Sequence, residues 1–208
     1  MTTTTTEVGR ILGSFDRIQF TVPELNREVL NELRWNSHEA EATRDGIDIT
    51  TLELSSSDIS ALKLIARADV ASILRNPGRA SVLEEAAVKA MTSSSAVGLL
   101  RTRLLTPEQF VEAGRSFERL WLAATRLGLQ VQPWTAFTFV ARLIDVPDGV
   151  IFNDREKQEL RLLRDRLDLV FARQCDWPHA LLFRVFRAPK ASKASLRRRL
   201  DDVVEVAA

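Results

Sequence analysis

The sequence is poor in the residues that build disulfide and metal sites. Its 208 residues include one cysteine, Cys175, and two histidines, His38 and His179. A single cysteine excludes an internal disulfide and a cysteine-based zinc cluster. Two histidines leave little for a histidine-rich metal site. Tyrosine is absent, which removes one common general acid. We therefore expect no metal site.

A charge excess and long apolar runs are also missing. Lys and Arg number 29 and Asp and Glu number 28, which gives a formal charge of +1. This balance provides no general attraction to nucleic acid or to a membrane surface. No apolar run approaches the roughly 18 residues of a membrane helix. The threonine-rich start lacks the charged and apolar parts of a signal peptide. These patterns favour a cytoplasmic protein without nucleic-acid or membrane partners.

Several familiar catalytic motifs do not occur. There is no Gly-x-Gly-x-x-Gly run, no phosphate-binding Gly-x-x-x-x-Gly-Lys-Ser/Thr loop and no Gly-x-Ser-x-Gly elbow. Cys175 and His179 lie four residues apart. This spacing suits a nucleophile and its base, but a loop before the last strand is the interpretation that we favour. The residues alone therefore name no catalytic group.

The composition is that of an ordinary globular domain, with 45% hydrophobic and 27% charged residues. We expect residues 1–6 to form a disordered leader and residues 7–208 to form a single domain. Short apolar runs predict strands at 96–100, 129–132 and 180–186. Apolar steps of three and four residues predict helices between them, so the pattern predicts an α+β fold. The expected helices begin near Glu7, Pro23, Ser56, Asp69, Ser81, Thr106 and Asn153.

Two of these helices carry more specific expectations. The helix after Thr106 has Pro107 at its first position, and its apolar side chains recur on one face that we expect to be buried. Gly114 costs about 1 kcal/mol there relative to alanine, so it marks either a close backbone approach or a tolerated defect. On the helix after Asn153, we expect the charged face to be solvated. The apolar face comprises Phe110, Ala113, Phe117, Leu120, Trp121, Ala124 and Leu127, and the charged face comprises Arg161, Arg164, Asp165 and Asp168.

The stretch 113–133 resembles the nitroreductase superfamily of flavoproteins. There, the central helix carries a glycine, a Leu-Ala-Ala step and a Leu-Gly-Leu turn before a strand that leads under the flavin. The matching positions here are Gly114, residues 122–124 and residues 127–129. Other stretches resemble one branch of this superfamily, whose domain occurs alone or fused behind an adenylating domain like that of ubiquitin-activating enzymes. They are residues 34–54, 95–100 and 196–204, and the resemblance covers about 7–205.

The resemblance implies a fold and an activity. The fold is a helix-flanked, mostly antiparallel sheet in an intertwined homodimer, with FMN at each of two interfaces. The helix after Thr106 would lie in the dimer core, through Phe110, Phe117, Trp121 and Leu127. The activity is that of an FMN-dependent oxidoreductase, which passes hydride from NAD(P)H through the flavin to a small conjugated substrate. An adenylating enzyme is an implied partner.

The resemblance also implies the cofactor contacts. The backbone of Pro133, Trp134, Thr135 and Ala136 would pass along the flavin ring, where its amides would bind the N5 and O4 edge. Trp134 would stack near the ring or serve as a core aromatic residue. In the tail, Arg197 and Arg198 hold the positions that grip the FMN phosphate, for which guanidinium groups are well shaped. The alternative for the pair is a solvated basic tail.

Two features of the superfamily are missing. Its leading Arg-x-Ser-x-Arg run, which holds the phosphate and ring, has no counterpart before Arg10, and its Asn-x-Gln-Pro-Trp run is absent. Arg10 and Arg17 are two helical turns apart and either replace the missing run at one phosphate or are surface charges. These departures leave an alternative function, a flavin-free, non-catalytic dimeric binding or scaffold protein with the same fold.

Overall fold

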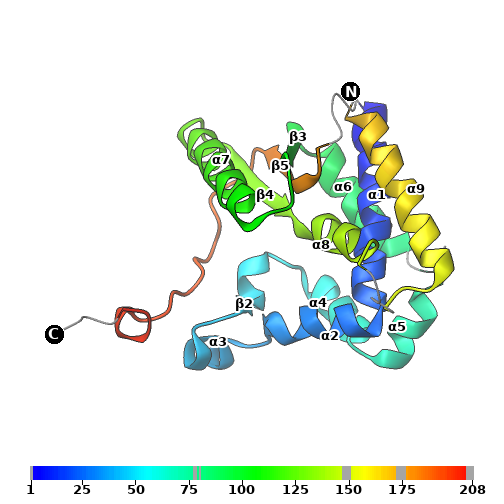
Figure 1. Cartoon of the computed structure of the whole chain (residues 1–208). Coiled ribbons are helices and arrows are strands. Elements are labelled where there is room, and N and C mark those ends of the chain that lie inside the picture. The colour runs from blue at the N-terminus through cyan, green and yellow to red at the C-terminus, as the bar shows by residue number, and fades with distance from the viewer. Residues whose placement is uncertain (1, 77–78, 80, 147–150, 172–176, 205–208) are drawn as a thin grey trace.

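Helices surround one small sheet (Figure 1). The computed structural model describes residues 2–76, 79, 81–146, 151–171 and 177–204. Within them, no helix is both long and apolar enough to cross a membrane. The helices are α1 (Thr2–Thr21), α2 (Pro23–Glu32), α3 (Ser37–Thr43), α4 (Ser56–Ile65), α5 (Ala68–Leu74), α6 (Ser81–Thr92), α7 (Pro107–Arg126), α8 (Thr135–Leu143) and α9 (Asp154–Val170), with short 3-10 turns η1 (Ile49–Leu52) and η2 (Leu200–Asp202).

The main sheet has three antiparallel strands in the order β3-β5-β4. These are β3 (Ala96–Arg101), β4 (Gln130–Trp134) and β5 (His179–Phe186). They confirm the predicted strands, and the fold is of the α+β class. A separate parallel pair joins β1 (Leu33–Arg34) to β2 (Ile47–Asp48).

Helix α1 is the centre of the core. Its apolar side chains are buried against α6, α8 and α9. Two glycines set the distance to α6: a Cβ on Gly9 would lie 2.5 Å from the Cα of Val88, and one on Gly13 would lie 2.5 Å from the Cα of Glu84. Because no real Cβ tolerates such contacts, glycine is required at both positions for the two helices to pack this closely.

The structure differs from the expectations at two helices. Helix α1 begins at Thr2, within the stretch expected to be a disordered leader. Helix α8 occupies residues for which the sequence pattern predicted no helix. It forms because Phe137, Val140 and Ala141 recur at helical spacing and are all buried in the core.

Helix α7 covers the outer face of the sheet. Phe117 packs against Phe183 of β5, with ring centroids 5.3 Å apart, and Ala124 is buried there. Thr106 begins the helix as predicted, because its hydroxyl accepts a hydrogen bond from the Gln109 amide. The buried face is narrower than expected: Trp121 is 39% exposed and Leu127 is 72% exposed within the chain.

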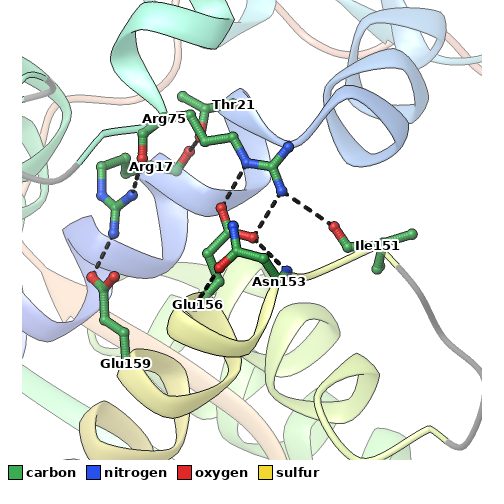
Figure 2. Close-up of polar contacts among 7 residues, drawn as sticks. All are labelled: Arg17, Thr21, Arg75, Ile151, Asn153, Glu156 and Glu159. Carbon is green, nitrogen blue, oxygen red and sulfur yellow. Dashed lines mark hydrogen bonds and ion pairs between the residues drawn. The ribbon is translucent and has the colours of Figure 1, made fainter.

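A buried arginine ties α1 to α5 and α9 (Figure 2). Arg17 is 1% exposed. Its Nη1 donates to the carbonyl of Arg75 over 2.9 Å, and its Nη2 donates to Oε1 of Glu159 over 2.5 Å. Arg75 in turn binds both carboxylate oxygens of Glu156. Glu156 also forms a capping box with Asn153 at the start of α9, where the sequence predicted a helix to begin.

Removing the charge of Glu159 should expose the dependence of the fold on this network. Glu159→Gln leaves the buried Arg17 cation without its counter-charge, so we expect a loss of about 2 to 3 kcal/mol in the free energy of unfolding by denaturant. Glu112→Gln is the control, because Glu112 pairs with Arg115 on the exposed surface of α7. Equal effects of the two substitutions would contradict this role.

Candidate functional site

The segment predicted to bind the flavin ring lies at the junction of β4 and α8. Pro133 and Trp134 end β4, an edge strand of the described sheet, and Thr135 and Ala136 begin α8. Trp134 is the N-cap residue, and no side chain caps this helix end. Since the first amides of a helix lack intrahelical acceptors, this junction keeps free N–H donors.

The side chain of Trp134 has partners within the chain. It is half-buried and packs against the main core. Its indole Nε1 donates a hydrogen bond to Oδ1 of Asp16 on α1, over 3.1 Å. The indole is therefore held from the side of α1, in the manner of a core aromatic residue.

Asp16 is a candidate that the sequence analysis missed. Burial raises its pKa from 3.8 to about 7, although the hydrogen bond from Trp134 opposes the shift. The signal in the sequence was an acidic residue between Phe15 and Ile18, in a helix whose apolar positions are fully buried. Its partner comes from a strand more than a hundred residues away, so the pairing itself required the fold.

The predicted phosphate ligands lie elsewhere in the chain. Arg197 and Arg198 belong to the tail that follows β5 and runs past α3, away from α8 (Figure 1). Lys193 fastens this tail, because its Nζ lies 2.9 Å from Oδ2 of Asp48. Both arginine side chains are exposed, and the acid nearest to Arg198 is Asp45 at 3.9 Å. One chain therefore does not bring the two parts of the predicted FMN site together.

The interpretation of Arg17 as a phosphate ligand is wrong. Arg17 is enclosed between α1, α5 and α9 and is bound to Glu159, whereas Arg10 is exposed. The two residues share a face of the isolated helix, but contacts with α5 and α9 bury Arg17 and leave Arg10 exposed. Packing against a helix that is distant in sequence thus gives Arg10 and Arg17 different environments, although helical periodicity places them on one face.

A second polar cluster joins α9 to the ends of β3 and β5. Oδ1 of Asp168 lies 2.7 Å from Nε2 of His179 and 2.5 Å from Nη2 of Arg101. The expectation that Asp168 is solvated is wrong: it is 8% exposed, since it neighbours the buried Leu167 and faces β5. Cys175, the proposed partner of His179, lies outside the described residues.

In this cluster Asp168 is ionised and His179 is neutral. Burial raises the pKa of Asp168, but hydrogen bonds from His179 and Arg101 outweigh it, and the pKa falls below its usual value. Burial lowers the pKa of His179 despite the nearby carboxylate. The imidazole is therefore neutral at pH 7, and its Nε2–H donates to the charged Asp168. No group of three or more potential metal-ligating His, Cys, Asp or Glu side chains occurs among the residues placed by the structure.

Comparison with known proteins adds one relative. The chain is similar to "Uncharacterized protein MT1398" of Mycobacterium tuberculosis (strain CDC 1551 / Oshkosh), with 31% identity over 193 residues. The match covers 90% of this chain but 26% of that protein, so the chain spans about a quarter of the length of this relative. No family model and no solved structure matches the chain.

The shifted pKa of Asp16 predicts a pH-dependent stability. Between pH 3.8 and about 7 the carboxyl is protonated in the folded chain and ionised in the unfolded one. Its contribution to stability is therefore complete below pH 3.8 and is lost as the pH rises to about 7. Asp16→Asn keeps an acceptor for Trp134, so the variant should gain stability relative to the parent chain as the pH rises.

Denaturant unfolding at pH 4 and pH 8 measures this difference. The exposed Asp69, paired with Arg67 on the surface, provides the control Asp69→Asn. A gain from Asp16→Asn that is the same at both pH values would show that Asp16 titrates normally in the folded chain.

Proposed function

We propose that the chain is the FMN-binding module of a nitroreductase-type oxidoreductase, which acts as a homodimer and uses NAD(P)H to reduce a small conjugated substrate. The observation that carries this proposal is the uncapped start of α8 at the ring-binding segment 133–136. The alternative is a flavin-free scaffold of the same fold.

The start of α8 suits the edge of a reduced flavin. The amides of Thr135 and Ala136 are donors at a helix N-terminus, where the helix dipole favours negative charge. Bound FMN would supply the hydride-transfer chemistry, and fixed N–H donors at this position would stabilise charge on its reduced ring. Asp16 would hold Trp134, and with it the end of β4, in a fixed position.

The tail supports a phosphate site that needs a second chain. The guanidinium groups of Arg197 and Arg198 are exposed. The acid near Arg198 is Asp45, at 3.9 Å, and Asp45 is already bound to Arg34 at 2.7 Å. Both guanidinium groups are therefore accessible to a phosphate. Because they lie away from residues 133–136 of their own chain, we propose that the tail of one protomer completes the site of its partner.

Helix α7 supports the homodimer. On this helix Val111 is 57% exposed, Leu122 is 60% exposed and Trp121 is 39% exposed. Apart from the backbone of α7 itself, no atom of the described residues lies within 4 Å of the position that a Cβ on Gly114 would take. Since the chain itself makes no close approach at this glycine, an approach by the same helix of a second protomer would account for it.

The similarity to a longer protein is consistent with a module that also occurs in fusions. The relative has further sequence outside the matched part, which is about a quarter of its length. A fusion behind an adenylating domain, as the resemblance implies, would have this arrangement. We propose an adenylating enzyme as the partner on that ground.

The flavin-free alternative also has specific support. The chain lacks the leading basic run, and Arg17, which might have replaced it, is committed to Glu159. The indole of Trp134 is likewise engaged by Asp16. A dimeric scaffold would retain the exposed face of α7 without any use for the tail arginines.

Titration of the purified chain with FMN decides between the two functions. We expect saturable binding tighter than about 10 µM, which corresponds to about 7 kcal/mol. Replacing Arg197 and Arg198 together by alanine should weaken binding at least about tenfold, because charge-assisted contacts are lost. Arg187 and Lys190, exposed in the same tail, provide the control double substitution.

Two outcomes would contradict the flavin proposal. Equal affinities of the two double variants would refute the phosphate assignment. Absence of saturable binding at about 1 mM FMN, with a folded dimeric protein, would leave the scaffold function.

Sedimentation of the Trp121→Glu variant tests the dimer separately. A charge on the uncovered face of α7 should turn a dimer into a monomer at micromolar concentration, since it must be desolvated at the interface. Leu169→Glu is the control, because Leu169 on α9 is 79% exposed and outside this face. A parent chain that sediments as a monomer would refute the dimer.

A further inference from the structure

A pocket of about 480 Å³ opens beside the Asp168–His179 pair. Helices α8 and α9 form two of its sides, and the end of β3 and the start of β5 close it. Part of its wall is apolar or aromatic. These wall residues are Leu105, Ala141, Val146, Trp177 and Pro178.

Two buried polar atoms that belong to residues lining this pocket have no partner among the described residues. They are Oγ1 of Thr138, a residue that is 7% exposed, and Nε of Arg142. In the described part of the chain, four buried side-chain atoms lack a hydrogen bond, and these are two of them. Folded proteins leave few buried polar atoms without a hydrogen bond. Two such atoms at one pocket therefore indicate that a bound ligand supplies the missing hydrogen bonds.

Among the residues that the structure describes, Arg142 has no counter-charge. Its guanidinium carbon lies 4.1 Å from the centre of the Phe110 ring. The ring attracts the cation but accepts no hydrogen bond from the N–H groups in the guanidinium plane. No hydrogen bond or ion pair joins it to any residue that the structure describes. Burial lowers its pKa, yet arginine keeps its charge at neutral pH. A partly buried cation of this kind is stabilised by an anion.

The other charges of the pocket do not supply that anion. Asp168 is neutralised by Arg101, and Asp145 is bound to Arg164. Asp165 is exposed at the rim, where water screens its charge. The pocket therefore combines one uncommitted cation with an apolar wall.

We propose that this pocket binds a small organic carboxylate, with Arg142 as its charge partner, the Thr138 hydroxyl as a donor to it and the Trp177–Pro178 wall against its apolar body. The proposal is independent of the flavin function, because it uses no residue of the segment 133–136 or of the tail. The neutral His179, oriented by Asp168, borders the same space.

Calorimetric titration with benzoate and with inorganic phosphate tests the site. We expect saturable benzoate binding in the millimolar range or tighter, and weaker binding of phosphate, which has no apolar body. Arg142→Met keeps an unbranched side chain beside Phe110 but removes the charge, so it should weaken benzoate binding at least tenfold. Arg161→Met is the control, because Arg161 lies near Asp145 but does not line the pocket.

The Thr138→Val variant distinguishes a loss of ligand binding from a loss of folding. Its hydroxyl has no partner in the chain, so the substitution should leave thermal stability unchanged or higher. It should nevertheless weaken benzoate binding several-fold. A folded Arg142→Met variant that binds benzoate as tightly as the parent chain would overturn the proposal. So would tighter binding of phosphate than of benzoate, or no saturable benzoate binding to the parent chain at about 10 mM.

Discussion

The buried Arg17 is the constraint on which the arrangement of the helices depends. It sits in the middle of the architecture, because α1 contacts α5, α6, α8 and α9. A buried cation must be paired, and its hydrogen bonds to Glu159 and to the Arg75 carbonyl fix α1 against two distant segments. The close approach of α6 at Gly9 and Gly13 fixes α1 against a further helix. The sheet and α8, which carry both candidate sites, are built on this frame.

The two candidate sites share helix α8 and strand β5. Helix α8 starts at the proposed ring-binding segment and, within two turns, contributes Thr138 and Arg142 to the carboxylate pocket. Strand β5 starts at His179, beside the pocket, and pairs with Trp134 through Leu182. A shift of α8 would therefore affect both sites, which gives a physical route by which an anion in the pocket could influence the β4–α8 junction.

Local patterns predicted the elements better than the sites. The strands, the helix after Thr106 and the helix capped by Asn153 were predicted because their signals lie within a few residues of one another. The environment of a charge is not local. Asp168 was expected in solvent from its place on a helix, but β5 covers it. Arg17 was expected at a surface or a phosphate, but Glu159 encloses it.

The sequence by itself determined the fold class, the strand positions and the absence of an internal disulfide, because composition and periodicity decide them. The sequence also identified residues 133–136 as the segment that resembles a flavin-binding stretch. Only the tertiary structure decided that Arg197 and Arg198 lie apart from that segment within one chain, that Trp134 is held by Asp16, and that Arg142 and Thr138 meet at one pocket. The physical reason is that these relations join side chains through burial and pairing between elements that no sequence period connects.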